Sequence, residues 1–536
     1  MTTNISKNNR DLLLEKINKL KNFIAEDGEN SAYISYLSEL ENAIIGKKYG
    51  LQYEEHEEEI DKILKASEPI LKEENKYLIP SGKVNFLIEG DNLSSLKILE
   101  KTHKSRISVI YIDPPYNTGG KDFMYDDTYV DETDTYTHSK WLSFMEKRLK
   151  LAKKLLMPGG IILISIDEHE HPNLKLLCNQ IFGEKNAVGE IIRKTKSVTG
   201  DKDTGFNLQH EYLLIYSNGK IYKKLYGAER ELKEYKNPDN DPNGAWISAD
   251  PSAKSGGPST SFEIMNPYTN RIDLPPKGRY WAFSKDTFNE YVQSGRIVFK
   301  KNYKEKERGF IFKRYAKNLE STGTLLSSLD CIENEYMNQA GTKESIKLEF
   351  QDKFKYPKPV AFIKKLLEHC TEKDSIILDF FAGSGTTAQA VMQLNQEDDG
   401  NRTFILCTNN ENEICEKVTF ERVRKVIEQN NYEEGLKYFK IDYVNKENKV
   451  YYEYAPQLVE NIKPLVELEN HIDFKNNSSV RIVLNDDELE TLLKNDQLLI
   501  KKLYISHEIM LGQDQEKILK IKNIEYVTIP DYYYSE

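Results

Sequence analysis

Short apolar runs alternate with helical stretches in two separate parts of this 536-residue chain. The apolar runs lie at 84–88, 107–112, 161–166, 375–380 and 403–407. The helical stretches lie at 93–101, 138–157, 360–370, 386–394 and 414–428. Continuous apolar runs of this length are typical of parallel strands buried on both faces. The sequence therefore predicts an α/β protein with a doubly wound sheet.

The segment between the two α/β parts has a different composition. Residues 218–350 are rich in Asn, Asp, Gly, Pro and Tyr and lack clear α/β alternation, which predicts an inserted module. The α/β parts are then 76–217 and 351–435, and they form either one interrupted sheet or two domains. A helical region at 1–75 and a mixed C-terminal region at 436–536 complete the predicted organisation.

Composition argues against several classes of protein. The five cysteines are widely spaced and include no Cys-x-x-Cys pair, which argues against a disulfide framework and a zinc ribbon. No run of 18 or more apolar residues is present and the first ten residues are polar, so no membrane span is expected and the protein is expected in the cytoplasm. The net charge of −11 is uneven, because residues 276–317 hold twelve Lys or Arg against four Asp or Glu.

The tetrapeptide Asp113-Pro114-Pro115-Tyr116 directly follows the apolar run 107–112. Its prolines fix extended backbone at the carboxyl end of a predicted strand, where ligands bind in open α/β sheets. An exocyclic amine on a heteroaromatic ring is a poor nucleophile, because its lone pair is delocalised. The Asp113 carboxylate and the Pro114 carbonyl can accept its two hydrogens and free that lone pair.

Two features of the tetrapeptide support this chemistry. Pro115 has no N–H to compete for the amine, and Tyr116 offers a flat face to a base flipped out of a duplex. The alternative is a rigid turn at the end of the strand, with Asp113 as a helix N-cap.

A glycine-rich motif joins the apolar run 375–380 to the helical stretch that follows it. Its residues are Asp379, Phe380, Phe381, Ala382, Gly383, Ser384, Gly385, Thr386 and Thr387. Small residues let backbone approach a ligand closely, and the helix N-terminus supplies free N–H groups. The spacing also fits the loose dinucleotide fingerprint, but the next strand ends at Asn409 without the acidic residue that the fingerprint needs. On this motif alone, a structural tight turn remains an alternative.

Together the two motifs resemble those of the DNA amino-methyltransferases. The Asp-Pro-Pro-Tyr motif comes first, the insert second and the glycine motif last, which is similar to the β-class arrangement. That class joins both motifs on neighbouring strands of one circularly permuted sheet, with a target-recognition domain between them. The resemblance implies S-adenosylmethionine as cofactor and N6 of a flipped adenine as methyl acceptor. It implies Asp113, Pro114, Pro115 and Tyr116 as catalytic residues.

Further positions match the same family. Gly90-Asp91-Asn92-Leu93 resembles the segment near the cofactor adenine, and Tyr356-Pro357-Lys358-Pro359 resembles the motif that lines the methionine end. In place of the family's acidic ribose ligand, this sequence offers Asn409 or Glu411. The cofactor-binding residues that the resemblance implies are Asp91, Asn92, Lys358, Pro359, Asp379, Phe380, Phe381, Ala382, Gly383, Ser384, Gly385, Thr386, Thr387 and Asn409.

The resemblance covers residues 84–445, and two segments within it point to one subfamily. Asn117-Thr118-Gly119-Gly120 and residues 210–216 are similar to the modification subunits of type III restriction systems, although this chain is somewhat short for them. The resemblance implies double-stranded DNA as substrate, a homodimer and a restriction helicase-nuclease as partner.

Four alternatives stay open at this point. An N4-cytosine methyltransferase ranks lower because such enzymes usually carry Ser in place of Asp113, and an RNA amino-methyltransferase is the related option. A DNA-binding specificity subunit that guides a nuclease is the third. A nicotinamide dehydrogenase is the fourth, and it leaves the Asp-Pro-Pro-Tyr motif unexplained.

The basic segment 276–317 interleaves cationic and aromatic side chains inside the predicted insert. Basic side chains neutralise phosphates and aromatic side chains stack or wedge between bases, so we predict DNA contact for this segment. The alternative is a solvated face over an aromatic core. The predicted DNA-binding residues are Arg279, Trp281, Lys300, Lys301, Lys304, Arg308, Lys313 and Arg314.

One further cluster, Glu168-His169-Glu170-His171, has the composition of a metal site. It lacks the His-Glu-x-x-His spacing of a zinc site and follows a predicted strand. The cluster is therefore interpreted as a surface turn, and no metal is predicted.

Overall fold

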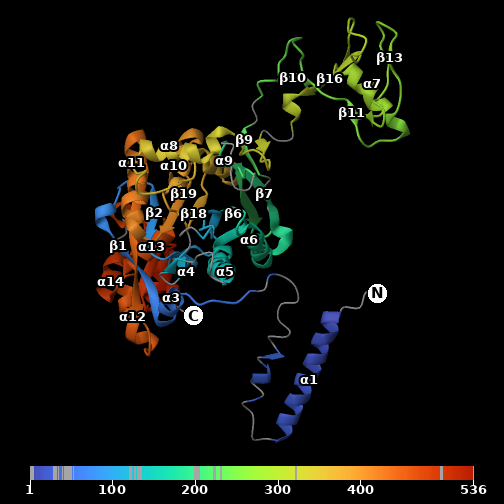
Figure 1. Cartoon of the computed structure of the whole chain (residues 1–536). Coiled ribbons are helices and arrows are strands. Elements are labelled where there is room, and N and C mark those ends of the chain that lie inside the picture. The colour runs from blue at the N-terminus through green and yellow to red at the C-terminus, as the bar shows by residue number, and fades with distance from the viewer. Residues whose placement is uncertain are drawn as a thin grey trace. The chain divides into compact units, whose positions relative to one another are not determined.

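The computed structural model of the chain describes residues 5–27, 33, 36–38, 40–41, 51, 53–119, 124–125, 128–129, 136–197, 206–220, 225–229, 232–319, 323–494 and 499–534 (Figure 1). The chain forms two compact units. The first comprises Met1–Lys224 and Ser327–Glu536, and the second comprises Leu225–Leu326. The second unit is thus shorter than the predicted insert 218–350, because residues from 327 onward pack with the first unit.

The first unit is built on a sheet of nine described strands in the order β1-β20-β2-β19-β18-β3-β6-β8-β7. The strands are β1 (Ser67–Glu73), β2 (Val84–Glu89), β3 (Ile107–Ile112), β6 (Leu156–Ile166), β7 (Ala187–Lys194), β8 (His210–Ser217), β18 (Ile376–Asp379), β19 (Thr403–Thr408) and β20 (Gly435–Asn445). Strands of the two sequence parts are interleaved, because β19 pairs with β2 and β18 pairs with β3. The predicted single, permuted sheet is confirmed.

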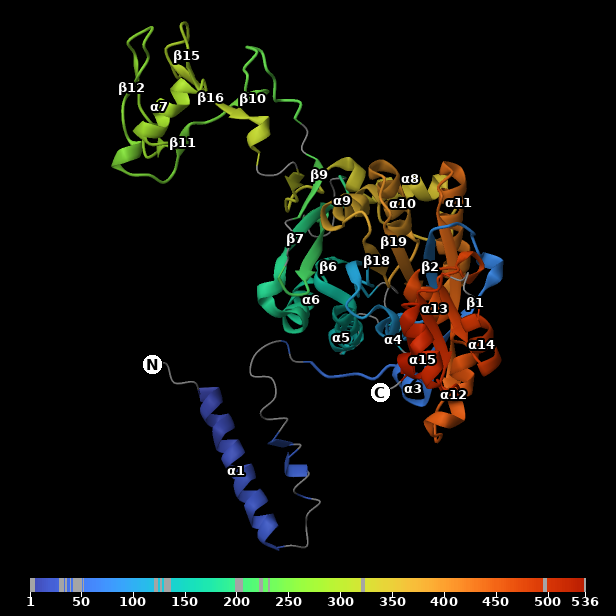
Figure 2. The same ribbon diagram turned by 180° about the vertical axis from the view of Figure 1, so that it is seen from behind.

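The central strands are parallel, and helices cover both faces of the sheet. The helices are α4 (Asn92–His103), α5 (Thr137–Leu155), α6 (His171–Cys178), α9 (Val360–Cys370), α10 (Thr386–Asp398) and α11 (Glu421–Asn430). Helices α4 and α5 lie on one side of the sheet, and α9 and α10 lie on the other (Figures 1 and 2). This double cover explains why β2 is buried along its whole length and reads as a continuous apolar run.

Two expected boundaries differ from the structure. The region 1–75 contains α1 (Ile5–Asp27) and α3 (Glu59–Ala66), but residues 67–73 form β1, which pairs antiparallel with β20. Pro69 disfavours a helix interior and is tolerated in an edge strand, which explains the difference. Helix α5 ends at Leu155, and residues 156–160 of the expected helix and stop signal belong to β6.

The C-terminal region contributes β20 to the large sheet and then forms a smaller parallel sheet in the order β21-β22-β23. Its elements are α12 (Tyr451–Glu460), α13 (Lys463–Asn470), β21 (Val480–Val483), α14 (Asp486–Lys494), β22 (Lys502–Ser506), α15 (Gln513–Ile521), β23 (Glu525–Ile529) and α16 (Asp531–Tyr534). A separate apolar cluster that includes Leu489, Leu503 and Leu519 forms its core. In the part of the chain that the structure describes, no helix is long and apolar enough to cross a membrane.

The second unit is a small, mostly β module with an aromatic core. Its elements are β9 (Tyr226–Glu229), β10 (Trp246–Ser248), β11 (Ser252–Ala253), β12 (Ile264–Met265), β13 (Ile272–Asp273), β14 (Tyr280–Trp281), α7 (Lys285–Gln293), β15 (Ile297–Phe299), β16 (Phe310–Tyr315) and β17 (Gly323–Leu325). Its core residues are Ile264, Trp281, Phe283, Ile297, Phe310 and Phe312.

Candidate active site

The two sequence motifs follow neighbouring strands. Val109 and Ile110 of β3 pair in parallel with Ile377 and Leu378 of β18. Parallel strands end at the same edge of a sheet, so the segment that begins at Asp113 and the glycine-rich turn lie side by side. The structure therefore brings together residues that are far apart in the sequence.

Lys358 binds the Asp-Pro-Pro-Tyr tetrapeptide directly. Its Nζ donates to both carboxylate oxygens of Asp113 at 2.8 Å and lies 2.8 Å from the Tyr116 hydroxyl. The Tyr116 hydroxyl in turn donates to Oδ1 of Asp113 at 2.8 Å. The resemblance assigned Lys358 to the methionine end of the cofactor, whereas here its ammonium lies on the Asp113 carboxylate.

A second buried carboxylate lies beside this group, and the sequence analysis did not identify it. Glu211 Oε2 is 3.3 Å from the Tyr116 hydroxyl, and Glu211 Oε1 is 3.7 Å from Lys358 Nζ. Oε1 also accepts from the fully buried guanidinium of Arg193 at 2.7 Å. Burial opposes ionisation of Glu211, but Lys358 and Arg193 together hold its pKa below the usual value. A glutamate within the apolar strand β8 is the signal that could have identified it.

The environment of Tyr116 keeps its phenol neutral. Burial, and the nearby Asp113 and Glu211 carboxylates, raise the pKa of Tyr116 well above its ordinary value. The preceding residue is also held in place, because the fully buried Trp141 donates from Nε1 to the Pro115 carbonyl at 2.7 Å. The tetrapeptide is thus fixed from β8, from α5 and by Lys358.

The glycine-rich turn is a tight connection between β18 and α10. Gly383 and Gly385 have φ of 48° and 76°, which favours glycine at both positions. A Cβ at Gly385 would also lie 3.2 Å from Cγ2 of Thr419. Helix α10 begins after Gly385 without a side-chain cap, so the first N–H groups of the helix are available to a ligand.

Asp379 anchors this turn from the end of β18. Its carboxylate accepts from the Phe381 amide at 3.0 Å and from the Thr387 hydroxyl at 2.5 Å. Burial and, to a smaller extent, the Asp113 carboxylate raise the pKa of Asp379 to about 7, against the lowering effect of these two hydrogen bonds. The group therefore titrates near neutral pH.

The other residues assigned to the cofactor lie at the same edge of the sheet. The Gly90 amide donates to the Thr408 carbonyl at 3.0 Å, which places the segment after β2 beside the exposed Asn409 that follows β19. The Asp91 side chain caps α4 by accepting hydrogen bonds from the backbone amides of Leu93 and Ser94. Asn92 Oδ1 accepts from Arg148, and Pro359 forms the N-cap of α9.

Two of the predicted DNA-binding residues are structural. Trp281 is 1% exposed, lies in the aromatic core of the second unit and donates from Nε1 to the Phe262 carbonyl. Lys313 is 3% exposed, and its Nζ donates to Asp239 and Asp241 at 2.5 and 2.6 Å. Neither side chain is accessible to DNA, because the strands β14 and β16 turn both inward.

The remaining six predicted residues reach the surface to different degrees. Lys301, Lys304 and Arg314 are exposed. Arg279, Lys300 and Arg308 are half-buried. Asp250 neutralises part of this charge, because it lies 3.2 Å from Arg279 and 3.7 Å from Arg308.

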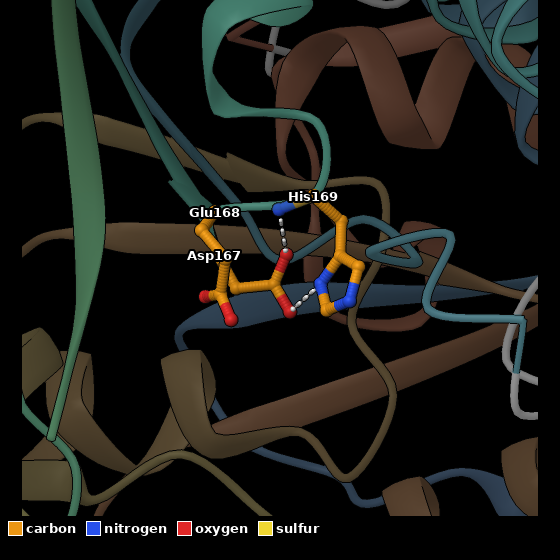
Figure 3. Close-up of side chains that lie close together, drawn as sticks. All are labelled: Asp167, Glu168 and His169. Carbon is orange, nitrogen blue, oxygen red and sulfur yellow. Dashed lines mark hydrogen bonds and ion pairs between the residues drawn. The ribbon is translucent and has the colours of Figure 1, made fainter. Parts of the chain in front are cut away.

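The acidic turn after β6 is only partly a surface turn. Glu168 and His169 are exposed, and His169 Nδ1 and its amide lie 2.9 and 3.0 Å from the Asp167 carboxylate (Figure 3). Ligand atoms of these three residues lie within 4.8 Å of one another, and the Asp167 carboxylate is already hydrogen-bonded to His169. The interpretation of the cluster as a surface turn is wrong for Glu170, because its side chain is fully buried.

The comparison with protein families identifies the family of the chain. A family model described as DNA methylase matches residues 107–421, which is more than half of the chain. The chain belongs to this DNA methylase family. The matched range begins with β3 and ends at the start of α11, so it includes both motifs and the inserted unit.

Three curated relatives are similar to this DNA methylase. The type III restriction-modification enzyme StyLTI Mod subunit of Salmonella typhimurium strain LT2 is 33% identical over 373 residues, which are 64% of this chain and 55% of the relative. The EcoPI Mod subunit of Escherichia phage P1 is 32% identical over 390 residues, or 63% of this chain and 59% of the relative. The type II methyltransferase M.KpnI of Klebsiella pneumoniae is 32% identical over 352 residues, or 60% of this chain and 79% of the relative.

The alignment is partial on both sides. The aligned part of this chain spans less than two thirds of the length of each Mod subunit. Among solved structures, the cytosine-N4-specific PvuII DNA methyltransferase aligns with a TM-score of 0.33 at 12% identity, covering 67% of this chain and 98% of that chain.

Proposed function

We propose that this DNA methylase transfers a methyl group from S-adenosylmethionine to N6 of an adenine flipped out of double-stranded DNA. The observation that carries the proposal is the pairing of β3 with β18. This pairing sets Asp113, Pro114, Pro115 and Tyr116 beside the glycine-rich turn, so an amine-polarising group and a cofactor cradle share one edge of the sheet.

The glycine-rich turn fits S-adenosylmethionine by its local structure. The two positive φ angles and the uncapped start of α10 form a turn with free backbone N–H groups, and a side chain on Gly385 would press on Thr419 and distort this turn. The residues that would hold the cofactor are Asp91, Asn92, Pro359, Asp379, Phe380, Phe381, Ala382, Gly383, Ser384, Gly385, Thr386, Thr387 and Asn409. When bound, S-adenosylmethionine supplies a methyl group on a sulfonium cation.

The tetrapeptide prepares the amine. The carboxylate of Asp113 has about four lone-pair sites, so it can accept a hydrogen from the adenine amine while Lys358 and Tyr116 occupy other sites. The Pro114 carbonyl accepts the second hydrogen, which returns the lone pair to nitrogen. Tyr116 is neutral and stacks on the base, and Lys358 orients the Asp113 carboxylate through its two hydrogen bonds.

The second unit is proposed as the DNA reader. It carries 17 Lys or Arg against 13 Asp or Glu, whereas the whole chain has a net charge of −11. Lys300, Lys301, Lys304, Arg308 and Arg314 are proposed to contact phosphates, together with the half-buried Arg279. Because two Mod subunits are similar to this chain, the proposed role is modification and specificity subunit of a type III restriction system, in the cytoplasm, as a homodimer with a helicase-nuclease partner.

The test is transfer of labelled methyl from S-adenosylmethionine to duplex DNA, followed by nucleoside analysis, with Asp113→Ala as the control. Label in N6-methyladenine is expected from the wild type and absent from the variant. Label in N4-methylcytosine would overturn the assignment of the base, and label in RNA alone would overturn the assignment of the substrate. DNA binding without any label would favour a specificity subunit.

A further inference from the structure

Glu170 is a fully buried carboxylate next to the catalytic tetrapeptide. Its Oε1 accepts from the side-chain amide of Asn117 at 2.5 Å and faces His138 Nδ1 at 2.7 Å. Its Oε2 accepts from the side-chain amide of Asn173 at 2.8 Å. A carboxylate is buried at low cost only when donors satisfy it, and both oxygens of Glu170 are satisfied here.

These partners come from three different elements. Asn117 directly follows Tyr116, His138 lies in the first turn of α5, and Asn173 lies in the first turn of α6. Glu170 itself is the N-cap residue of α6, yet its side chain makes no cap hydrogen bond to that helix. The carboxylate is directed instead toward the tetrapeptide segment and α5.

Asn117 needs such a partner because of its backbone. Its φ is 62°, a left-handed conformation that Asn tolerates but does not prefer over the extended one. Its side chain is buried, and its Oδ1 has no hydrogen-bond partner among the residues that the structure describes. The amide–carboxylate bond to Glu170 is therefore the described side-chain contact that fixes Asn117, and with it the direction in which the chain leaves Tyr116.

We infer that Glu170 is a positioning residue for methyl transfer, which rests on the proposed function of the site. Through Asn117 it fixes the carboxyl end of the tetrapeptide, while Trp141 fixes Pro115 at 2.7 Å and Lys358 fixes the Asp113 carboxylate. Glu170 does not touch the proposed substrate or cofactor site directly. Its effect reaches the reaction through the placement of the Tyr116 ring and the Pro115 backbone.

Glu170→Gln is the most informative variant. The side-chain shape is kept, but one oxygen acceptor becomes an NH2 group that faces a donor of Asn117, His138 or Asn173. The matched control is Glu168→Gln, which removes the same charge from an exposed position two residues away on the same turn. His138→Ala is a second variant, and it should leave folding intact because 64% of the His138 side chain is exposed.

The first measurement is methyl transfer to plasmid DNA, normalised to the number of cofactor-binding sites in each preparation. For Glu170→Gln we expect kcat to fall roughly 10- to 100-fold, since small displacements of reacting groups cost that much. The KM for DNA and the affinity for S-adenosylmethionine should stay within about twofold of wild type. His138→Ala should lower kcat severalfold, and Glu168→Gln should match the wild type.

The second measurement is amide hydrogen exchange of the protein without ligands. Exchange at the amides of residues 116–119 should be faster in Glu170→Gln than in Glu168→Gln, with the strands β3 and β18 unchanged. Equal kcat and equal exchange in these two variants would overturn the inference. A loss of cofactor-binding sites at unchanged kcat per site would also overturn it, since that result indicates a purely structural role. A wild type that methylates no DNA would refute the proposed function, and the exchange comparison would still decide the role of Glu170.

Discussion

Replacing Asp379 by Asn should make the free energy of unfolding of this protein less dependent on pH. Asp379 is 2% exposed at the end of β18, and its carboxylate is bonded to the Phe381 amide and the Thr387 hydroxyl. Burial raises its pKa to about 7. An asparagine has the same shape and can still accept from Phe381, but it has no charge to bury.

The size of the effect follows from the two pKa values. An unfolded chain gives an aspartate a pKa of about 3.9. Folding therefore takes up a proton between about pH 4 and pH 7, and the free energy of unfolding of the wild type falls as the pH rises through this window. Relative to low pH, this titration lowers the free energy of unfolding of the wild type by about 1.5 kcal/mol at pH 5 and by about 4 kcal/mol at pH 8. The free energy of unfolding of Asp379→Asn, measured against the wild type, should therefore rise by about 2 to 3 kcal/mol between these pH values.

The assay is urea unfolding of both proteins at pH 5, 6, 7 and 8. Trp141 reports on the first unit when both tryptophans of the second unit are replaced by Phe in each protein. A pH-independent offset added to this growing difference is compatible with the reasoning, because the amide changes one hydrogen bond at every pH. A difference that does not grow with pH would refute it, since it would mean that Asp379 is not held protonated in the folded state.

Further predictions separate catalytic, DNA-binding and structural residues. Asp113→Ala should lower methyl transfer at least about 100-fold and leave cofactor affinity within about twofold, as measured by labelled transfer and equilibrium dialysis; retained transfer would contradict its role. Lys301→Ala should leave the melting temperature unchanged and lower the salt slope of DNA binding by about one, and an unchanged slope would exclude a phosphate contact. Lys313→Met should instead lower the melting temperature of the second unit. Arg193→Met should cost about 3–5 kcal/mol of stability, because Glu211 loses its buried partner; a neutral result would contradict that pairing.

The sheet could be predicted from sequence because its signals are local. Most of the central strands are short and largely apolar, and each motif directly follows such a run, as Asp113 follows residues 107–112 and Asp379 ends residues 376–379. The shared edge of parallel strands then places both motifs together without any knowledge of distances. Pairing across the sheet also explains why the two sequence parts complete one sheet rather than two.

The side of a strand or loop that faces solvent could not be predicted in the second unit. Its strands are short, so alternation of polar and apolar residues is too brief to assign a face. Lys313 and Arg314 are neighbours in β16, yet the first is buried against two aspartates and the second is exposed. Composition alone therefore marked a basic segment correctly but could not separate its surface residues from its core.

The charged side chains around Tyr116 show why the rest of the site could not be predicted from the sequence. Arg193 and Glu211 precede the inserted unit, whereas Asn338, which accepts from Arg193 at 2.7 Å, and Lys358 follow it. Local patterns carry no signal for contacts across more than a hundred residues, and only the closed sheet places these groups together. Glu211 lies between two cations, so removing Lys358 leaves Asp113 without its cation while Glu211 keeps Arg193. The chain on both sides of the insertion therefore contributes to the proposed active site, and the contacts of Tyr116 depend on both parts.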